Sequence, residues 1–299
     1  MLNLKRHFRN CDTFTFEENK LRAGLYRPFC KKRMYFADII VDELGSNQKI
    51  FPNVHAESEN QAICVPNVGG RSQFWCIGTN TIPNYTLTSI DATQCFPLYI
   101  YDEDEGNRRE NIADWSLTQF QKHYKDKQIL KPDIFHYVYA VLHHHKYREK
   151  YATNLKRELP RIPFAPDFWA FAKAGKKLAD FHVNYEKQAE YPLKWLEDKD
   201  AKVDYRVEGM TLSKDKTQIR YNDFLTLTGI PPEVFEYRLG NRSALDWIID
   251  QYRVSIDKRS GITNDPNNLD DPQYIVHLIG KVITVSLETM KIIKVLPEL

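Results

Sequence analysis

Long apolar segments and paired-cysteine motifs are both absent from this chain. No stretch approaches the run of about 20 apolar residues that a helix needs to cross a bilayer, so we expect no membrane contact. The cysteines are scattered and form no Cys-x-x-Cys pair, and no signal peptide is recognisable; they are Cys11, Cys30, Cys64, Cys76 and Cys95. This usage predicts reduced thiols in a cytoplasmic protein.

A large net charge is also lacking. With 42 Lys and Arg against 40 Asp and Glu, the formal net charge is +2, so any basic surface that attracts an anionic partner must be local. The 299 residues, 42% of them hydrophobic and 27% charged, have the composition of a globular protein. This length allows one large domain or two closely packed ones.

Two regions of different periodicity follow one another along the chain. Residues 37–101 contain short apolar runs separated by Pro, Gly and Asn, which predict strands at Ala62–Val65, Phe74–Ile77, Tyr85–Leu87 and Phe96–Tyr101. From Trp115 onward the period is mainly helical. We therefore predict an α+β fold. A β-rich half of mixed or antiparallel strands, residues 1–110, packs on a mainly helical half, residues 111–299, within one continuous domain.

Several helices are marked by apolar spacing and by their ends. Asp133 is the expected N-cap of a helix that runs through His143, and a basic helix is expected over Tyr147–Leu159. Helical spacing continues from Phe168 to Tyr185, with Gly175 permitting close packing and His182 on the buried face. A long amphipathic helix is predicted over Pro272–Leu296, with a buried stripe that ends at Ile292 and Val295. Short strands are predicted at Lys202–Val207, Gln218–Tyr221 and Phe224–Thr228.

The N-terminal stretch is locally basic and rich in aromatic residues. Residues 1–36 contain nine Lys and Arg against three Asp and Glu, interleaved with Phe and Tyr. Cations beside flat aromatic rings suit contacts with phosphates and bases. The residues that we predict to contact phosphate here are Arg27, Lys31, Lys32 and Arg33. The alternative is a strand pair with aromatic residues in the core and solvated lysines.

Amide-rich loops separate the predicted strands of the β-rich half. Arg can read guanine, and Asn or Gln can read adenine, through two hydrogen bonds in the major groove of DNA. The candidates with this chemistry are Arg71, Gln73, Asn80 and Asn84. Ordinary loop composition is the alternative explanation for each of them.

A helix followed by a cationic loop stands out between Glu236 and Pro266. Ser243 is a plausible N-cap, and Leu245, Ile248, Ile249 and Tyr252 share one helix face. Trp247 is expected in the core. The loop behind the helix contributes the remaining predicted phosphate contacts, which are Arg253, Lys258 and Arg259.

Three consecutive histidines, His143–His145, invite a metal-binding interpretation. Adjacent residues of a helix point about 100° apart, so the three side chains cannot easily share one ion. We predict no metal site and no catalytic residue. His182 is expected to be a hydrogen-bonded core histidine.

Nearly the whole chain resembles a known family in long ungapped segments. Arg242–Tyr252 and Ser260–Pro266 match the pattern R-S-A-L-x-W-I-I-x-x-Y followed by S-G-I-x-N-D-P, and Tyr26–Phe29 matches Y-R-P-F. Further matching segments are Tyr137–His143, Pro160–Pro163, Ala174–His182 and Val285–Thr289. The pattern is similar to the C-terminal specificity, or target-recognition, domain of type ISP restriction-modification enzymes.

The resemblance implies a module that recognises double-stranded DNA and directs an adjoining adenine-N6 methyltransferase. Full-length enzymes of this kind also carry a nuclease and a helicase-like ATPase. The matching motifs are missing here: there is no G-x-x-x-x-G-K-[ST], no [DNS]-P-P-[YF] and no glycine-rich loop for S-adenosylmethionine. We therefore expect no cofactor on this chain, with S-adenosylmethionine and ATP bound only by other modules.

Two other functions remain open on the sequence. The aromatic N-terminal region could dock on a methyltransferase or helicase subunit, making the chain a scaffold without DNA binding of its own. A free-standing hydrolase or nuclease that uses Asp38, Asp42, Glu43 or the histidines is the third hypothesis. Catalysis needs groups that converge on a pocket, and the sequence shows no such set.

Overall fold

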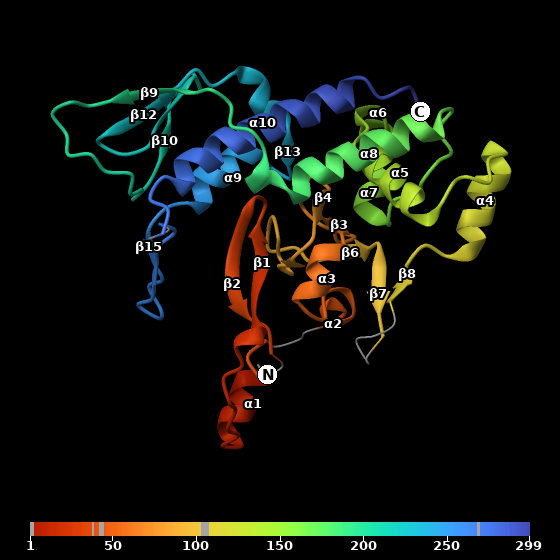
Figure 1. Ribbon diagram of the computed structural model, residues 1–299, viewed down its shortest axis with the longest axis horizontal. Coiled ribbons are helices and arrows are strands. Elements are labelled where there is room, and N and C mark those ends of the chain that lie inside the picture. Colours follow the sequence, from red (N-terminus) through yellow and green to blue (C-terminus); the bar gives the residue numbers. More distant parts are fainter. Residues whose placement is uncertain (1–2, 38, 42–44, 103–107, 268–269) are drawn as a thin grey trace. The chain divides into compact units, whose positions relative to one another are not determined.

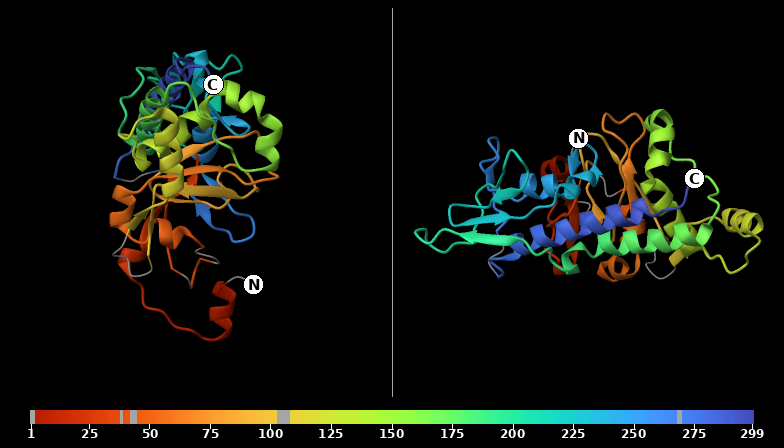
Figure 2. Two further views of the ribbon diagram at one scale, coloured as in Figure 1. Left: turned by 90° about the vertical axis from the view of Figure 1, so that its right-hand side faces the viewer. Right: turned by 90° about the horizontal axis from the view of Figure 1, so that it is seen from above.

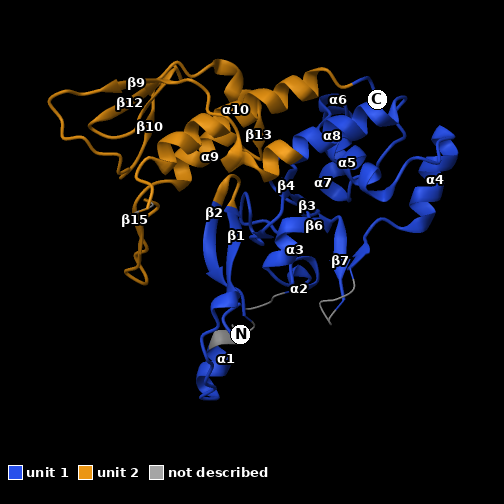
Figure 3. Cartoon of the chain, in the orientation of Figure 1, with its two compact units in different colours: residues 1–26, 31–179, 297–299 blue, residues 27–30, 180–296 orange. Residues whose placement is uncertain are grey.

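The computed structural model describes residues 3–37, 39–41, 45–102, 108–267 and 270–299 (Figure 1). Asp38, Asp42 and Glu43 lie outside the described residues. The chain groups into two compact units (Figure 3). The first unit comprises residues 1–26, 31–179 and 297–299, and the second comprises residues 27–30 and 180–296.

Three small sheets form the β part of the first unit. Strands β1 (Leu21–Arg27), β2 (Cys30–Tyr35) and β5 (Ile82–Pro83) form a mixed sheet in the order β2-β1-β5, with β1 and β5 parallel. An antiparallel sheet has the order β4-β3-β6, from β3 (Ala62–Pro66), β4 (Ile77–Thr79) and β6 (Thr93–Pro97). Strands β7 (Tyr99–Tyr101) and β8 (Arg108–Glu110) pair antiparallel.

The helices of the first unit occupy the ranges α1 (Asn3–Arg9), α2 (Asn47–Ile50), α3 (Val54–Glu59), α4 (Asp114–Tyr124), α5 (Lys131–His143), α6 (His145–Lys150), α7 (Ala152–Arg157) and most of α8 (Phe168–Val183), with a single 3₁₀ turn η1 (Glu18–Lys20). Helices α2 and α3 interrupt the region predicted to be mostly strands. Asn53 caps α3, since its side-chain oxygen accepts from the N–H of Ala56 at 2.9 Å.

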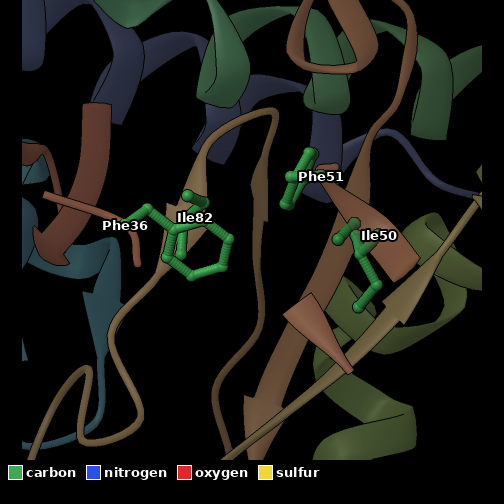
Figure 4. Close-up of a cluster of buried hydrophobic side chains, with 5 residues drawn as sticks. Phe36, Ile50, Phe51 and Ile82 are labelled. Atoms are coloured by element: carbon green, nitrogen blue, oxygen red, sulfur yellow. The ribbon is translucent and has the colours of Figure 1, made fainter. Parts of the chain in front are cut away.

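A compact apolar cluster lies between the mixed sheet and the short helices of the first unit (Figure 4). Phe51 and Ala62 are fully buried in it, and Ile50 and Ile82 are nearly so. The cluster therefore fixes β5, and the loop that follows it, against the hairpin formed by β1 and β2.

Gly175 brings two helices of the first unit into close contact, as its spacing predicted. A Cβ atom at this position would lie 2.6 Å from the carbonyl carbon of His136 and 3.2 Å from the nitrogen of Ala140. Because both atoms belong to the backbone of α5, only glycine permits this packing distance.

The second unit contains a four-stranded antiparallel sheet, two hairpins and two helices. The sheet has the order β10-β11-β12-β9, from β9 (Lys194–Glu197), β10 (Thr211–Leu212), β11 (Gln218–Arg220) and β12 (Leu225–Thr228). The hairpins pair β13 (Arg238–Leu239) with β14 (Arg242–Ser243), and β15 (Ser255–Ile256) with β16 (Thr263–Asn264). The helical elements are α9 (Ala244–Gln251), the long α10 (Tyr274–Lys294, seen along its length in Figure 2) and the 3₁₀ turns η2 (Tyr185–Lys187) and η3 (Pro232–Glu236).

Helix α9 begins where its sequence predicted. The Ser243 hydroxyl accepts from the N–H of Asp246 at 3.1 Å, and the Asp246 carboxylate accepts from the N–H of Ser243 at 3.1 Å, which completes a capping box. Trp247 is buried, with 4% of its surface exposed, and its indole N–H donates to the carbonyl of Leu239. Gly240 and Asn241 form the two-residue turn between β13 and β14.

Other boundaries predicted from the sequence were wrong. Leu130 is the N-cap of α5 and Asp133 lies inside the first turn, because Pro132 fits that turn and the Asp133 carboxylate accepts from the N–H of Leu130. The single helix expected over Tyr147–Leu159 is broken at Tyr151, where the backbone leaves the helical range.

Three predicted strands are not formed as expected, and one predicted core residue is exposed. Of the strand predicted at Phe74–Ile77, only Ile77 lies in a strand, at the start of β4. Residues 202–207 pair with no strand, and the side chain of Asn222 binds the carbonyls of Asp204 and Arg206 instead. Residues 85–87 form a turn beside Asn84 rather than a strand. Val295 follows the end of α10 and is 79% exposed. The α+β class itself is confirmed, while the division at residue 110 stays a prediction.

Candidate nucleic-acid interface

The hairpin of β1 and β2 carries the basic N-terminal candidates. Its turn is Pro28-Phe29, and Phe29 has a positive φ of 58° although it is not glycine. Burial offsets that strain: the Phe29 ring is fully buried and packs edge-on against Tyr185 at 5.2 Å between ring centroids. The turn is therefore held rigidly, and with it the strand positions on either side.

The candidate cations of this hairpin lie at its surface, whereas Arg22 on β1 is buried and paired with Glu57. Arg33 is exposed, and Arg27, Lys31 and Lys32 are half-buried. The Lys32 ammonium stands over the ring of Tyr26, 4.7 Å from its centroid. This arrangement combines a cation with an aromatic face, as the N-terminal composition suggested.

Asn84 follows β5 and is positioned by the same sheet. Its backbone N–H donates to the carbonyl of Leu25 at 2.9 Å, so it lies next to the β1–β2 hairpin. Its side-chain oxygen accepts from the N–H and the hydroxyl of Thr86, at 2.8 and 3.1 Å. A two-point contact with adenine uses both the oxygen and the amino group of an asparagine, so Asn84 can offer only its amino group unless this turn opens.

Asn80 is half-buried on the short loop between β4 and β5. Its side-chain oxygen points inward and accepts no hydrogen bond from the residues that the structure describes. Thr79 and Thr81 on either side are buried and bonded to one another. Asn80 is therefore set more deeply than an exposed loop residue, which restricts its reach toward a partner.

Arg71 and Gln73 are exposed on the loop between β3 and β4, with Ser72 buried between them. The loop is anchored through its backbone, because the N–H of Arg71 donates to the Asp91 carboxylate at 2.9 Å and the N–H of Gly69 donates to the carbonyl of Lys156 at 2.8 Å. The anchors leave the guanidinium and the side-chain amide of these two residues at the surface. Of the four base candidates, Arg71 and Gln73 have the most accessible functional groups.

The remaining phosphate candidates lie in the second unit. Arg253 follows α9, is exposed, and stands 3.8 Å from the Asp250 carboxylate, which also pairs with Arg242. Lys258 and Arg259 are exposed at the turn between β15 and β16. The predicted residues thus divide between both compact units, with Arg27, Arg253, Lys258 and Arg259 in the second.

The β15–β16 hairpin itself was missed, since the segment was interpreted as a polar loop. A local signal was present: aspartate, two cations, serine and glycine separate two short segments that each contain an isoleucine. Asp at the start and Gly at the end of a turn are typical of a hairpin connection. The exposed Ile256 and Ile262 were not among the predicted contact residues.

His143, His144 and His182 are hydrogen-bonded within the structure, and Cys76 is buried. His143 Nδ1 donates to the carbonyl of Tyr139 at 2.8 Å, and a nitrogen of His144 donates to the carbonyl of Pro297 at 3.1 Å. His182 is buried and hydrogen-bonded to Thr289 at 2.9 Å, as predicted. Burial raises the pKa of the Cys76 thiol to about 11, which suppresses its nucleophilic thiolate.

Within the described ranges, no group of three or more His, Cys, Asp or Glu is placed to hold a metal ion. Over the same part of the chain, no helix is long and apolar enough to cross a membrane. The features that distinguish the surface are instead cationic hairpins and polar loops on a scaffold of small sheets and long helices. These features define an α+β module whose surface is locally cationic and polar.

The family to which this module belongs follows from a comparison with known families. Residues 2–278 match the model of the Type ISP C-terminal specificity domain, and the chain belongs to that family. The resemblance noted in its sequence motifs is thereby confirmed.

The solved structures of two Type ISP enzymes and of a DrdV–DNA complex are similar to almost the whole chain. LlaBIII, an ATP-dependent Type ISP restriction-modification enzyme solved bound to DNA, matches with a TM-score of 0.88 and 33% identity over 100% of this chain. A nuclease-deletion mutant of the Type ISP enzyme LlaGI, in complex with a DNA substrate mimic, matches with a TM-score of 0.84 and 33% identity over 98% of this chain. The DrdV–DNA complex matches with a TM-score of 0.87 and 35% identity over 97% of this chain.

The chain spans only a fraction of these enzymes, 20% of the LlaBIII chain, 26% of the LlaGI chain and 29% of the DrdV chain. The search of curated proteins found no match.

Proposed function

We propose that this chain recognises a specific sequence in double-stranded DNA and directs an adjoining adenine-N6 methyltransferase module to that site. The observation that carries the proposal is the similarity, over 98% or more of the chain, to Type ISP enzymes whose structures were solved with DNA or a DNA substrate mimic. The identities of 33–35% and the TM-scores of 0.84–0.88 support a shared fold over nearly the whole chain.

The surface chemistry supports this function. The rigid β1–β2 hairpin and the turn between β15 and β16 present cations that can neutralise phosphates. The anchored loop with Arg71 and Gln73 presents groups that can bond to base edges. Phosphate contacts fix the position of a protein on the duplex, while base contacts select the sequence, and the chain offers side chains for both tasks.

We assign no catalytic step to this chain. In this proposal S-adenosylmethionine and ATP bind to other modules of the enzyme, and the chain contributes the choice of target. Methylation by the complete enzyme then depends on how this chain places the duplex, because an N6 methyltransferase must reach an adenine taken out of the stack.

The test is a selection of binding sites from randomised duplexes with the isolated chain, followed by fluorescence anisotropy on the enriched sequence. We expect one motif to be enriched and its affinity to fall steeply as salt rises, since counterions are released on binding. A scrambled duplex of the same length is the control. Absence of binding to any duplex, at salt as low as about 50 mM, would remove the proposal.

A docking function is the second candidate, because exposed aromatic rings gather near the N-terminus. Phe8, Phe14 and Phe16 are 84%, 53% and 60% exposed, and the Phe16 ring stacks on Tyr35 at 5.4 Å. Exposed aromatic residues are enriched where proteins bind one another. If the chain is a scaffold only, Phe14→Ala and Phe16→Ala will abolish its capture by a separately expressed methyltransferase module, and no duplex will be selected.

A further inference from the structure

The β15–β16 hairpin exposes an aliphatic side chain on each of its two faces. Ile256 is 65% exposed and Ile262 is 67% exposed. The strand register pairs Ile256 with Thr263, so the next pair along is Asp257 with Ile262, whose backbones are joined by a 2.9 Å hydrogen bond. Because successive residues of a strand point to opposite faces, Ile256 and Ile262 stand on opposite sides of the ribbon.

The turn of this hairpin is held by a dense set of local hydrogen bonds. One oxygen of Asp257 accepts from the N–H groups of Arg259 and Ser260, at 3.0 and 2.8 Å, and from the Ser260 hydroxyl at 2.9 Å. Gly261 adopts a positive φ of 71°, and its N–H donates to the carbonyl of Asp257 at 2.8 Å. Lys258 and Arg259 contribute no side-chain atom to these bonds, so their charged groups project from a fixed turn.

The base of the hairpin is fixed as well, at both of its strands. The N–H of Val254, just before β15, donates to the carbonyl of Glu208 at 2.9 Å. Beyond β16, the Asn267 side chain exchanges two hydrogen bonds with the backbone of Val207, at 2.9 and 3.0 Å. A ribbon anchored at its base and closed at its turn loses little conformational freedom when it binds a partner.

The charges near the turn are unbalanced in favour of cations. Lys258 and Arg259 are exposed and make no ion pair with any residue that the structure describes. The nearest acid, Asp257, is already occupied by its three hydrogen bonds. The turn therefore favours an anionic surface.

A partner of this hairpin should be anionic at the turn and should offer an apolar contact to one of the two exposed isoleucines. The major groove of duplex DNA has both properties. It is about 12 Å wide, admits a two-stranded ribbon, is lined by phosphates and displays thymine methyl groups on its floor. Two-stranded ribbons are among the elements that read DNA in this way.

We propose that the β15–β16 hairpin enters the major groove, with Lys258 and Arg259 at phosphates and with one of the two isoleucines, Ile256 or Ile262, against thymine C5-methyl groups on the groove floor. This inference rests on the proposed function and deepens it, because it assigns part of the base reading to apolar contacts outside the amide-rich loops.

The experiment removes one methyl group at a time from the DNA. Each thymine of the selected duplex is replaced by deoxyuridine, and binding is measured by anisotropy with the wild-type chain, Ile256→Ala and Ile262→Ala. For the wild type we expect at least one uracil substitution to weaken binding by about fourfold, the worth of one methyl group withdrawn from apolar contact. In the variant whose missing isoleucine contacts that methyl group, the duplex with thymine and the duplex with uracil at that position should bind equally tightly.

Leu196→Ala is the matched control, since Leu196 is an aliphatic residue of the same unit with 55% exposure on β9. It should keep the full dependence on thymine. Thermal unfolding of the isoleucine variants should match the wild type, because both side chains are largely exposed.

Two results would overturn the proposal while leaving DNA recognition intact. One is a wild-type chain that binds every uracil duplex as tightly as the parent. The other is a uracil penalty that persists unchanged in both isoleucine variants. Failure of the wild-type chain to bind any duplex would instead remove the proposed function itself.

Discussion

Replacing Gly175 by alanine tests how tightly α8 packs on α5 in the first unit. The new Cβ would lie 2.6 Å from the carbonyl carbon of His136 and 3.2 Å from the nitrogen of Ala140. Non-bonded carbon atoms are most favourably placed about 3.5–4.0 Å apart, so the two helices would have to separate by roughly 1 Å at this crossing. Neither contact can be relieved by rotating a side chain, because both atoms belong to the backbone.

Two opposing effects decide the sign of the change in stability. Alanine is favoured over glycine within a helix by about 1 kcal/mol, whereas forcing extra volume into a packed contact costs about 1–3 kcal/mol and sometimes more. The clash here involves rigid backbone, so we expect the steric term to prevail and the free energy of unfolding to fall by about 2 kcal/mol. In urea titrations followed by tryptophan fluorescence, the midpoint should move to a lower concentration.

Gly209→Ala is the control for this experiment. A Cβ at position 209 meets no atom within 4 Å, and the residue lies in a loop of the second unit. Alanine there should leave stability unchanged or raise it by about 0.4–1 kcal/mol, through the lower entropy of the unfolded chain. If Gly175→Ala unfolds at the same urea concentration as the wild type, or a higher one, the close contact with α5 does not exist as described.

Three further predictions follow from the described residues. Trp247→Ala should lower the free energy of unfolding by about 3–5 kcal/mol, while Trp115→Ala, at a residue that is 70% exposed, should change it little in the same urea titration. Single changes to alanine at five of the phosphate candidates, Lys31, Lys32, Arg33, Lys258 and Arg259, should weaken binding to all DNA sequences alike. Each change should also lower the slope of log affinity against log salt by about one unit. If the slope is unchanged in all five variants, these five residues do not contact phosphate. Among the base candidates Arg71, Gln73, Asn80 and Asn84, at least one change to alanine should weaken binding to the selected site by about 1–3 kcal/mol and relax the base preference at one position. Repeating the site selection with each variant measures this preference. If all four variants select the wild-type motif, other residues read the bases.

Features encoded by neighbouring residues were the ones that could be predicted from the sequence. The start of α9 follows from Ser243 and Asp246, three residues apart. The extent of α10 follows from its apolar stripe, and the close approach at Gly175 follows from a small residue on a buried helix face. Each of these depends on a period or a cap that lies within a few turns of chain.

Features that depend on partners far along the chain could not be predicted in the same way. Residues 202–207 have the composition of a strand, but Asn222 binds their carbonyls and no strand pairs with them. Short apolar runs are ambiguous between strand and helix until the tertiary contacts are known. This ambiguity explains why α2 and α3 were missed in a region that reads as strands.

The chemistry of the candidate interface was easier to predict than its accessibility. Arg71 and Asn84 were selected for the same hydrogen-bonding ability, yet Arg71 is exposed while the Asn84 oxygen is occupied by Thr86. The spacing of an asparagine and a threonine two residues apart is a local signal for such a turn, so this difference could have been recognised. The exposure of Ile256 and Ile262 depends on the packing of the whole second unit, and the sequence alone does not reveal it.

In the turn between β15 and β16, different residues among five consecutive positions determine the backbone shape and the charge. Its shape is encoded by Asp257, Ser260 and Gly261, and its charge by Lys258 and Arg259. Substitutions at the two cationic positions can therefore alter affinity while the backbone stays the same. Residues 258 and 259 can therefore be substituted together in protein engineering, and random mutation can also change these two positions without unfolding the turn.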